Sequence, residues 1–379
     1  MAKKLTLTSI ILLIVALIAI LTFFTDKPTT GNTISEKPTY KIGSPLELTG
    51  KYASFGEDLK NAMNLAVEEV NQEKPFNLEI IYEDSQSDAK GSVTAARKLI
   101  DIDKVKILAG TMGSGNVLAM APIAEENKVI LFTPGASSAE ITTAGDFVFR
   151  NRETSEAHGK GVAEFLVSKG ITKVAVLAGQ ASNSQSYKNF FIENFQDLGG
   201  EITSISDYNP ESNDFRTEIA KAQATNAEAF YLAVNSGLDG GLIVKQAKEA
   251  GFEGTIMGST GLETGEFLEA AGEAANGVYF TSPAFDLSNP KVKEYNEKYS
   301  SRYEEQSSAF AANAYDAIKI LSEAIDYCHG DNTECIRDFL YGLDNYPGIG
   351  GLTTFDSNGD VIKPVMIKTV KDNKIVRYD

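Results

Sequence analysis

The sequence predicts an α/β protein with two doubly wound lobes, each a parallel sheet covered by helices on both faces. From Tyr40 onward, short apolar runs alternate with segments of helical periodicity, which is the pattern of such sheets. A second series of the same kind and of similar length begins near Lys173. The chain has 379 residues, 42% of them hydrophobic. This is enough for two or three domains with a core in each, since a domain usually takes about 100–200 residues.

The N-terminal residues are expected to form a separate unit. Leu5–Phe24 is an uncharged, apolar run that follows Lys3 and Lys4, and about twenty such residues can cross a membrane as a helix. No small-residue cleavage site follows the run, so we expect a membrane anchor over residues 1–24, with a cleaved signal peptide as the alternative. The lysines on its short side place the rest of the chain outside the cytoplasm. The polar residues 25–39 predict a flexible tether.

The first series supplies the elements of the first lobe. After the first strand, Leu59, Met63, Ala66 and Val70 recur at helical spacing, so we expect one buried stripe on that helix. The predicted helices cover residues 56–71, 88–101 and 114–127. The predicted strands are residues 40–46, 77–84, 104–110, 128–135 and 146–150.

The second series supplies the second lobe, again with helices between the strands. Its predicted strands are residues 173–179, 201–208, 229–234, 255–260 and 277–284. Beyond Pro283 the periodicity becomes helical, and the last thirty residues predict two strands around an Asn358-Gly359 turn. The helices of this block are expected at residues 289–306, 309–328 and 336–343.

A helical block followed by a terminal hairpin implies that the chain crosses between the lobes three times. The expected crossings lie near residues 150–152, 281–284 and 350–353. We therefore assign residues 40–150 and 284–350 to the first lobe, and residues 151–283 and 351–379 to the second.

The formal charge of −17 narrows the possible partners. A chain this acidic is repelled by a polyphosphate backbone, and no basic stripe with interleaved aromatic residues offsets the repulsion. We therefore expect no nucleic-acid partner.

Cys328 and Cys335 are the only two cysteines, and the predicted topology places them outside the membrane. In an oxidising compartment, six intervening residues favour a disulfide that closes a small loop. A metal site would have to recruit His329, but no second pair of ligands lies nearby in the sequence. We expect the disulfide and no metal.

Two loops rich in Gly, Ser and Thr each follow an apolar strand, at residues 110–115 and 133–138. In open α/β sheets, ligands bind outside the carboxyl ends of the strands, where helices present their N-termini. We expect Ser114 to cap a helix that begins at Gly115, so that its hydroxyl and the free backbone amides face a ligand. The second loop adds further hydroxyls, and its backbone can approach a ligand closely. The two loops predict a cradle for one carboxylate or a similar small polar group.

Nucleotide binding and catalysis are not indicated. The loop GTMGSG lacks the Gly-Lys-Ser/Thr ending of a P-loop and is not Gly-x-Gly-x-x-Gly, so we expect no nucleotide cofactor. His158 and His329 have no obvious nucleophile partner. Residues 356–360 alternate as calcium ligands do, but Val361 stands where such a loop needs Gly, so a hairpin turn is favoured. An enzyme on this fold would need a general base in the cleft, and the sequence offers none.

Six long blocks of the sequence follow one another in a distinctive order: IGSPLELTGKYASFGEDLKNAMNLAVEEVN, GTMGSGNVLAMAPIAEENKVILFTPGASSAEIT, FRNRETSEAHGKGVAEFL, QAKEAGFEGTIMGSTG, SSAFAANAYDAIKIL and GGLTTFDSNGD. By these blocks the chain resembles the branched-chain amino-acid (Leu/Ile/Val) binding proteins of ABC transporters. The resemblance covers Tyr40–Asp379. It implies the type 1 periplasmic-binding, Venus-flytrap fold, in which two lobes joined by three strands close on a ligand.

This resemblance implies a binding protein rather than an enzyme. The expected partners are a small polar metabolite (an amino acid or a related amide or carboxylate), an ABC permease, and the membrane through the N-terminal anchor. We expect a monomer without a cofactor. Two alternatives keep the same fold: a receptor module that reports the ligand to a membrane partner, and a urea or short-chain amide binder.

The resemblance also implies roles for residues of the first lobe. Ser114, with the backbone of Gly113, matches the position that binds the ligand carboxylate. The carbonyl of Gly135 and the hydroxyl of Ser137 match positions at the ligand ammonium. The apolar walls of the pocket match Phe55 and Phe310.

The second lobe departs from the family pattern. Asn183-Ser184 stands where the family commonly has Tyr-Gly, and Asn235-Ser236 replaces an expected aromatic residue. Thr260 aligns with the acid that pairs with the ligand ammonium, and a threonine cannot neutralise a buried charge. Asn183, Ser236 and Thr260 are thus either ligand contacts or ordinary polar loop residues. Either another acid reaches the site or the ligand is not a simple amino acid; the candidate acids are Glu47, Asp239 and Glu263.

Overall fold

The computed structural model describes residues 37–209, 211–234 and 236–378. The predicted anchor, residues 1–24, lies outside these residues, as does the tether before Lys37, so both stay predictions. Within the described part of the chain, no helix combines the length and the apolar character that a membrane crossing requires. The first strand begins at Thr39, close to its predicted start.

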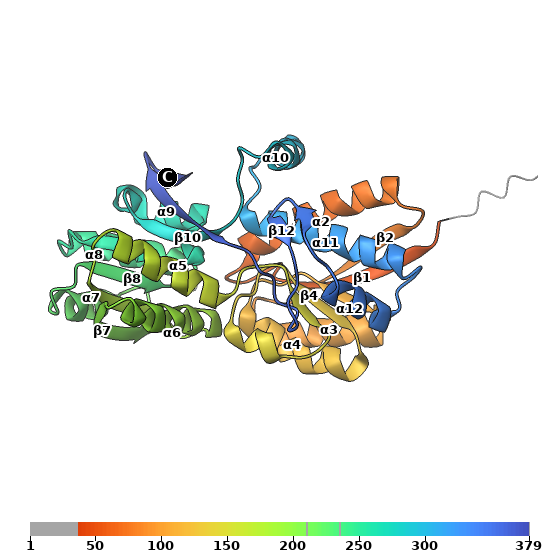
Figure 1. Ribbon diagram of the computed structural model, residues 1–379, viewed down its shortest axis with the longest axis horizontal. Coiled ribbons are helices and arrows are strands. Elements are labelled where there is room, and N and C mark those ends of the chain that lie inside the picture. Colours follow the sequence, from red (N-terminus) through yellow and green to blue (C-terminus); the bar gives the residue numbers. More distant parts are fainter. Residues whose placement is uncertain (1–36, 210, 235, 379) are drawn as a thin grey trace, which may run out of the picture. The chain divides into compact units, whose positions relative to one another are not determined.

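The first lobe contains a parallel sheet of five strands in the order β2-β1-β3-β4-β5. Side chains alternate between its two faces, as in any strand. Ile107 and Ile130 belong to the core under α2 and α11, whereas Leu108 and Leu131 pack with α3 and α4 on the opposite face. Figure 1 shows these helix pairs on the two sides of the sheet. The strands are β1 (Thr39–Leu46), β2 (Asn77–Asp84), β3 (Ile107–Ala109), β4 (Ile130–Thr133) and β5 (Val148–Arg150).

The helices of the first lobe come from both ends of the sequence. The predicted stripe is confirmed, since Leu59, Met63, Ala66 and Val70 are all buried. It faces α11, whose alanine-rich surface is buried along most of its length. The helices are α2 (Ala53–Glu73), α3 (Ala89–Asp101), α4 (Ser114–Asn127), α10 (Pro290–Tyr303), α11 (Ala309–Tyr327) and α12 (Thr333–Tyr341).

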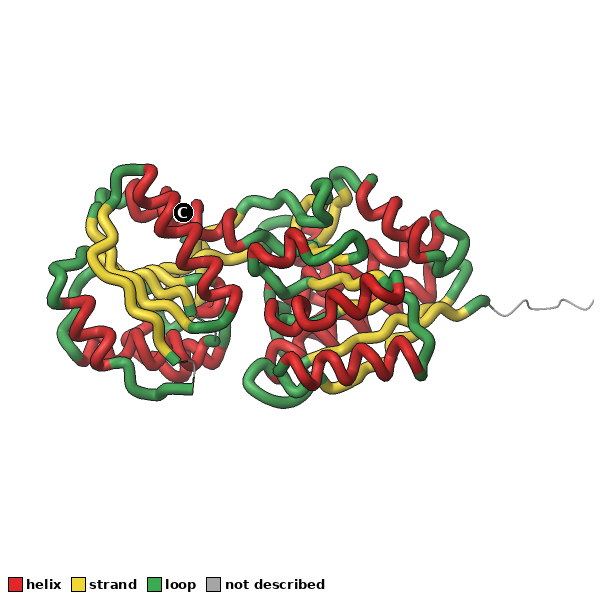
Figure 2. The backbone as a smooth tube through the Cα atoms, turned by 90° about the horizontal axis from the view of Figure 1, so that it is seen from below, coloured by secondary structure: helices red, strands yellow, loops and turns green. Residues whose placement is uncertain are grey.

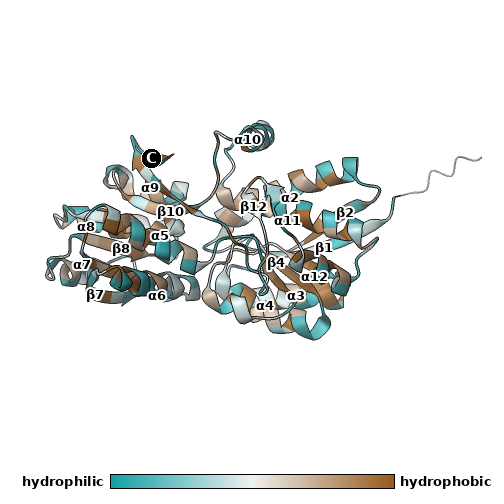
Figure 3. Ribbon diagram, viewed as in Figure 1, coloured by the Kyte–Doolittle hydropathy of each residue, from teal (hydrophilic) through white to brown (hydrophobic). Residues whose placement is uncertain are grey.

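The second lobe contains a mixed sheet of seven strands in the order β14-β13-β10-β9-β8-β6-β7. Five strands are parallel, and the terminal hairpin adds two antiparallel strands at one edge. Both faces of the parallel part are covered, and β8 is accordingly hydrophobic along its length (Figure 3). The strands are β6 (Lys173–Gly179), β7 (Glu201–Tyr208), β8 (Ala229–Ala233), β9 (Thr255–Gly258), β10 (Tyr279–Pro283), β13 (Val365–Lys371) and β14 (Lys374–Arg377).

Two layers of helices enclose this second sheet, as the tube in Figure 2 shows. One layer packs on Val174 and Val176, and the other packs on Ala175 and Leu177. The first layer consists of α5 (Ser155–Ser168) and α6 (Ser182–Asp197), and the second of α7 (Arg216–Gln223), α8 (Gly237–Glu249) and α9 (Gly265–Ala271).

The predicted position of the terminal hairpin turn is wrong. β13 and β14 turn at Asp372-Asn373, both with positive φ (51° and 56°), as a two-residue type I′ turn requires. Asn358-Gly359 does form a turn, but a separate one, flanked by an antiparallel bridge between Phe355 and Val361. The Asp356 carboxylate accepts the backbone amides of Asn358 (2.8 Å) and Asp360 (3.0 Å) within it. Asn-Gly and Asp-Asn both suit tight turns, and only the pairing of the strands shows which of the two joins the terminal hairpin.

The last crossing also differs in place from the expected residues 350–353. β11 (Tyr346–Gly348) and β12 (Gly351–Thr353) form a separate short ladder. Phe355 and Val361 then pack in the core of the first lobe, so the chain passes to β13 after Val361.

The predicted disulfide is confirmed. Cys328, directly after α11, is bonded to Cys335 in α12, with an S–S distance of 2.01 Å.

Candidate functional site

A small cavity lies between the two lobes at the carboxyl ends of the first sheet's strands. Its free volume is about 30 Å³, which is room for one or two water molecules. Three kinds of groups meet there: aromatic rings, the N-terminus of α4, and polar groups of the second lobe. The lining residues are Tyr52, Phe55, Met112, Gly113, Ser114, Arg152, Asn183, Thr260, Gly261 and Phe310.

Ser114 does not cap α4, so that prediction is wrong. It is the first residue of the helix, and Gly113 holds the cap position without a side-chain bond. The Ser114 hydroxyl instead accepts the backbone amides of Ser137 and Ser138, each at 3.1 Å. These two bonds join the glycine- and serine-rich loops, as we expected for loops that follow neighbouring strands. Since both lone pairs of the hydroxyl are used, its proton remains available for donation.

The N-terminus of α4 already has a carboxyl partner within the protein. The fully buried Glu47 carboxylate accepts the backbone amides of Met112 and Gly113 at 3.1 Å and the side-chain amide of Asn116 at 3.0 Å. Burial raises the pKa of the Glu47 carboxyl, and the two amides oppose that shift. The first-turn amides of Ser114 and Gly115 have no intrahelical carbonyl to bind, so they remain as donors.

Aromatic side chains form the apolar side of the cavity. Phe55 and Phe310 meet edge to face, with their ring centroids 5.5 Å apart. Both line the cavity, as does Tyr52, so the structure brings the two predicted wall residues together. Such a wall suits an apolar group on a ligand.

Arg152, which sequence reasoning missed, occupies the polar side of the cavity. Its guanidinium donates to the carbonyl of Gly135, to the Tyr187 hydroxyl (2.9 Å) and to the Thr260 hydroxyl. It also lies over the Phe310 ring, 4.7 Å from the centroid. Arg152 sits on the first crossing, between β5 and α5, so its side chain can reach both lobes.

Tyr187, on α6, was also missed. Its hydroxyl lies 2.7 Å from that of Ser137 and 3.2 Å from that of Thr260, and the side chain is 1% exposed. These bonds link the loop after β4 to the second lobe. A signal existed, because Tyr187, Phe191 and Phe195 recur every four residues on one buried face, and a buried tyrosine hydroxyl usually finds a partner.

The remaining predicted residues divide into two groups. Asn183 and Thr260 line the cavity. Ser236 does not: it caps α8 by accepting the amide of Asp239 at 3.3 Å. Gly135 and Ser137 are not among the residues that line the cavity; Gly135 is bonded to Arg152 and Ser137 to Tyr187. Asn235 lies outside the described residues.

The arrangement is a cavity between two lobes, lined by hydrogen-bond donors at the strand ends of the first sheet and by aromatic side chains. A family profile of periplasmic binding proteins matches residues 39–374. The chain belongs to the periplasmic binding protein family. Such proteins are the extracytoplasmic substrate-binding components of ABC transporters.

Three relatives illustrate the similarity. The leucine-, isoleucine-, valine-, threonine- and alanine-binding protein of Pseudomonas aeruginosa is 26% identical over 328 residues, which are 85% of this chain and 87% of the relative. The crystal structure of a leucine-binding protein from Thermotoga maritima matches with a TM-score of 0.83 and 29% identity, over 90% of this chain and 98% of its own. A branched-chain amino-acid binding protein of Streptococcus pneumoniae, in complex with isoleucine, matches with a TM-score of 0.83 and 25% identity, over 89% and 97%.

In this periplasmic binding protein, none of the three candidate acids lines the cavity. Glu47 binds the start of α4, as described above. Asp239 lies in the first turn of α8, where burial raises the pKa of its carboxyl to about 6. Glu263 pairs with Lys368 and accepts the Ser282 hydroxyl at 2.5 Å. Thr260 therefore has no acidic substitute among the residues that line the cavity.

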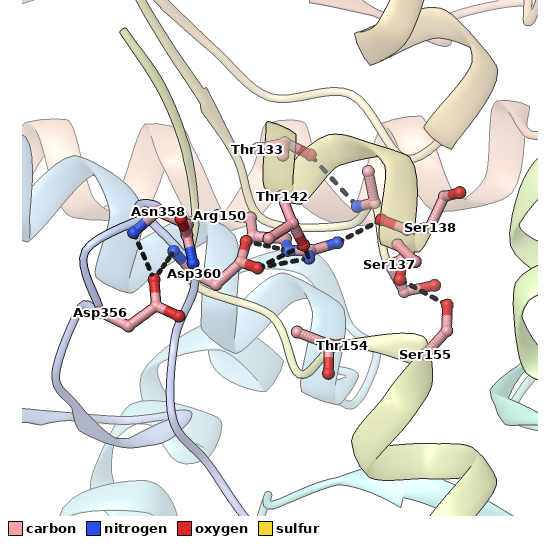
Figure 4. A network of polar contacts seen from close by, with 12 residues as sticks. Thr133, Ser137, Ser138, Thr142, Arg150, Thr154, Ser155, Asp356, Asn358 and Asp360 are labelled. Carbon is pink, nitrogen blue, oxygen red and sulfur yellow. Dashed lines mark hydrogen bonds and ion pairs between the residues drawn. The ribbon is translucent and has the colours of Figure 1, made fainter. Parts of the chain in front are cut away.

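A second buried arginine, Arg150, is the last residue of β5, where the first crossing begins in this periplasmic binding protein (Figure 4). Its guanidinium forms two bonds with the Asp360 carboxylate, at 2.5 and 2.7 Å, and donates to the Ser138 carbonyl at 2.6 Å. The Thr142 hydroxyl also binds Asp360, at 2.7 Å. The loop around Asn358-Gly359, predicted as a hairpin turn, thus supplies the counter-ion for the end of β5.

Proposed function

We propose that this protein captures a small metabolite with a carboxylate and an apolar part between its lobes, and delivers it to a membrane permease. The Ser114 hydroxyl carries the proposal. It is held by two backbone amides, its proton remains to be donated, and Ser114 lines the same cavity as Phe55 and Phe310. The branched-chain amino acids named for the relatives share these two chemical features.

In the proposed complex, the carboxylate binds the Ser114 hydroxyl and the first-turn amides of α4. A helix N-terminus attracts an anion by its dipole and its free donors together. The apolar part packs on Phe55 and Phe310. Because the cavity is too small for such a ligand in the described conformation, entry requires the lobes or the lining side chains to move apart. Closure around the ligand would then produce the form that a permease recognises.

The N-terminal run is part of the same proposal. We propose that residues 1–24 stay as a membrane anchor, which would keep the binding domain near its permease. Membrane fractionation, with mass spectrometry of the mature N-terminus, tests this point. A mature chain that begins after residue 24 would show a cleaved signal instead.

Substitution of Ser114 by alanine tests the pocket. The probes are leucine, valine, 4-methylpentanoate and benzoate, first compared by thermal shift because a specific binder raises the apparent stability. For the probe with the largest shift, we expect S114A to weaken calorimetric affinity by about 1–3 kcal/mol, the cost of an unmet buried polar group.

The matched control is S322A, which removes another buried serine hydroxyl, bonded to the Lys319 carbonyl in α11 and remote from the cavity. It should leave affinity unchanged. Equal affinity for S114A and the parent chain would contradict the proposed carboxylate site.

A further inference from the structure

Arg152 is a buried cation that has no acidic partner among the described residues. Only 4% of its surface is exposed. All of its hydrogen bonds in that part of the chain go to neutral oxygens, on Gly135, Tyr187 and Thr260, and its Nε atom has no partner there. The Phe310 ring adds a cation–π contact, which does not neutralise the charge.

The acid next along the chain does not replace a counter-ion. Glu153 forms no hydrogen bond or ion pair with Arg152, and neither of its carboxylate oxygens has a hydrogen-bond partner in the described part of the chain. Burial raises the pKa of the Glu153 carboxyl, and the nearby charge of Lys363 opposes that shift more than Arg152 does. The described residues therefore supply no carboxylate that binds the guanidinium.

Arg152 also occupies the acceptors that an amino acid would need for its ammonium group. The Gly135 carbonyl and the Thr260 hydroxyl, two of the groups that hold the guanidinium, stand at the positions that sequence similarity assigned to the ammonium. A second cation brought there would find these acceptors taken and would be repelled by the guanidinium. An anion would instead be attracted, because a buried charge without a counter-ion is costly.

We propose that Arg152 makes the cleft select a carboxylate that has no α-ammonium group, such as a 2-oxo, 2-hydroxy or unsubstituted acid with an apolar chain. The inference rests on the proposed function, since it assumes that the cavity is the ligand site. In this complex the guanidinium supplies positive charge where the side chain of an amino-acid binder supplies negative charge. Ser114 and Arg152 both line the cavity, so we expect one small anion to contact both.

Calorimetry on the full chain with two matched ligand series tests the selection. The first series is leucine, 2-hydroxy-4-methylpentanoate, 4-methyl-2-oxopentanoate and 4-methylpentanoate. The second is phenylalanine, phenylpyruvate and 3-phenylpropanoate. Within each series the carboxylate and the apolar part are constant, and only the substituent at C2 changes. We expect the best ammonium-free acid to bind at least tenfold more tightly than the amino acid.

The R152Q variant, which keeps a polar side chain but removes the charge, should reduce this preference at least tenfold. The control K160Q makes the same charge change on the exposed face of α5 and should leave the preference intact. Thermal unfolding of each variant shows whether the fold is retained.

The outcomes separate the two proposals. Tighter binding of leucine or phenylalanine than of their ammonium-free analogues would overturn the selection while leaving the proposed function standing. An unchanged preference in R152Q would overturn the role of Arg152. If no carboxylate of either series binds, the proposed function itself is overturned.

Discussion

Arg150 and Arg152 are separated by one residue, and both side chains are buried, but their surroundings differ in one respect. Arg150 forms two bonds with the carboxylate of Asp360. Arg152 is surrounded by neutral oxygens and an aromatic ring. A buried ion pair stabilises the fold only while both partners are present, whereas a buried cation without an anion raises the free energy of the folded state.

The difference separates a structural site from a binding site on the same short segment. Arg150 ends β5 and ties the loop at Asp360 to the first lobe, where the third crossing begins. Arg152 lies one step further along the first crossing and faces the cavity between the lobes. We infer that the first charge is satisfied within the chain, and that the second is left for a ligand.

The largest expected effect comes from breaking the Arg150 pair. D360A leaves the fully buried guanidinium without its carboxylate, so we expect the free energy of unfolding to fall by about 3–5 kcal/mol. Urea denaturation measures it. The control D338A removes a carboxylate paired with Arg337 at the surface, where such pairs contribute about 0–1 kcal/mol. Equal losses in the two variants would show that the Arg150 pair contributes no more than a surface pair.

A smaller effect is expected at the hydroxyl that links the two lobes. Y187F keeps the buried ring but removes the bonds to Ser137, Arg152 and Thr260. We expect a loss of about 1–3 kcal/mol, because buried polar groups are left with fewer partners. Urea denaturation in the absence of ligand tests this prediction. Y341F, which removes a hydroxyl bonded to the Asp146 carbonyl near the surface, serves as the control and should lose less.

The smallest expected effect comes from removing Arg152 itself. R152M removes a buried charge for which the described residues supply no acid, and with it one donor to the carbonyl of Gly135. We therefore expect the free energy of unfolding to stay within about 1 kcal/mol of the parent. A loss as large as that of D360A would show that Arg152 stabilises the fold as Arg150 does, and the contrast between the two arginines would fail.

Local pattern was sufficient to predict most elements of this protein. β2, β6 and β7 have the predicted bounds, because a short apolar run between turn residues leaves few other positions at which the strand could start or end. The meeting of Ser114 with the loop at Ser137 also followed from sequence, since the carboxyl ends of neighbouring parallel strands share one edge of a sheet. The turn of the terminal hairpin was misplaced because Asn358-Gly359 and Asp372-Asn373 carry similar local signals.

The sequence by itself determined the order of strands and helices, the buried stripe of α2 and the pairing of Cys328 with Cys335, because periodicity and short spacing act within a few turns of chain. Only the tertiary structure decided which acid binds the start of α4, which arginine pairs with Asp360, and which arginine finds no acid among the described residues. Those outcomes depend on groups up to 210 residues apart. No local pattern tells whether a charge on a crossing segment will find its counter-ion once the lobes have packed.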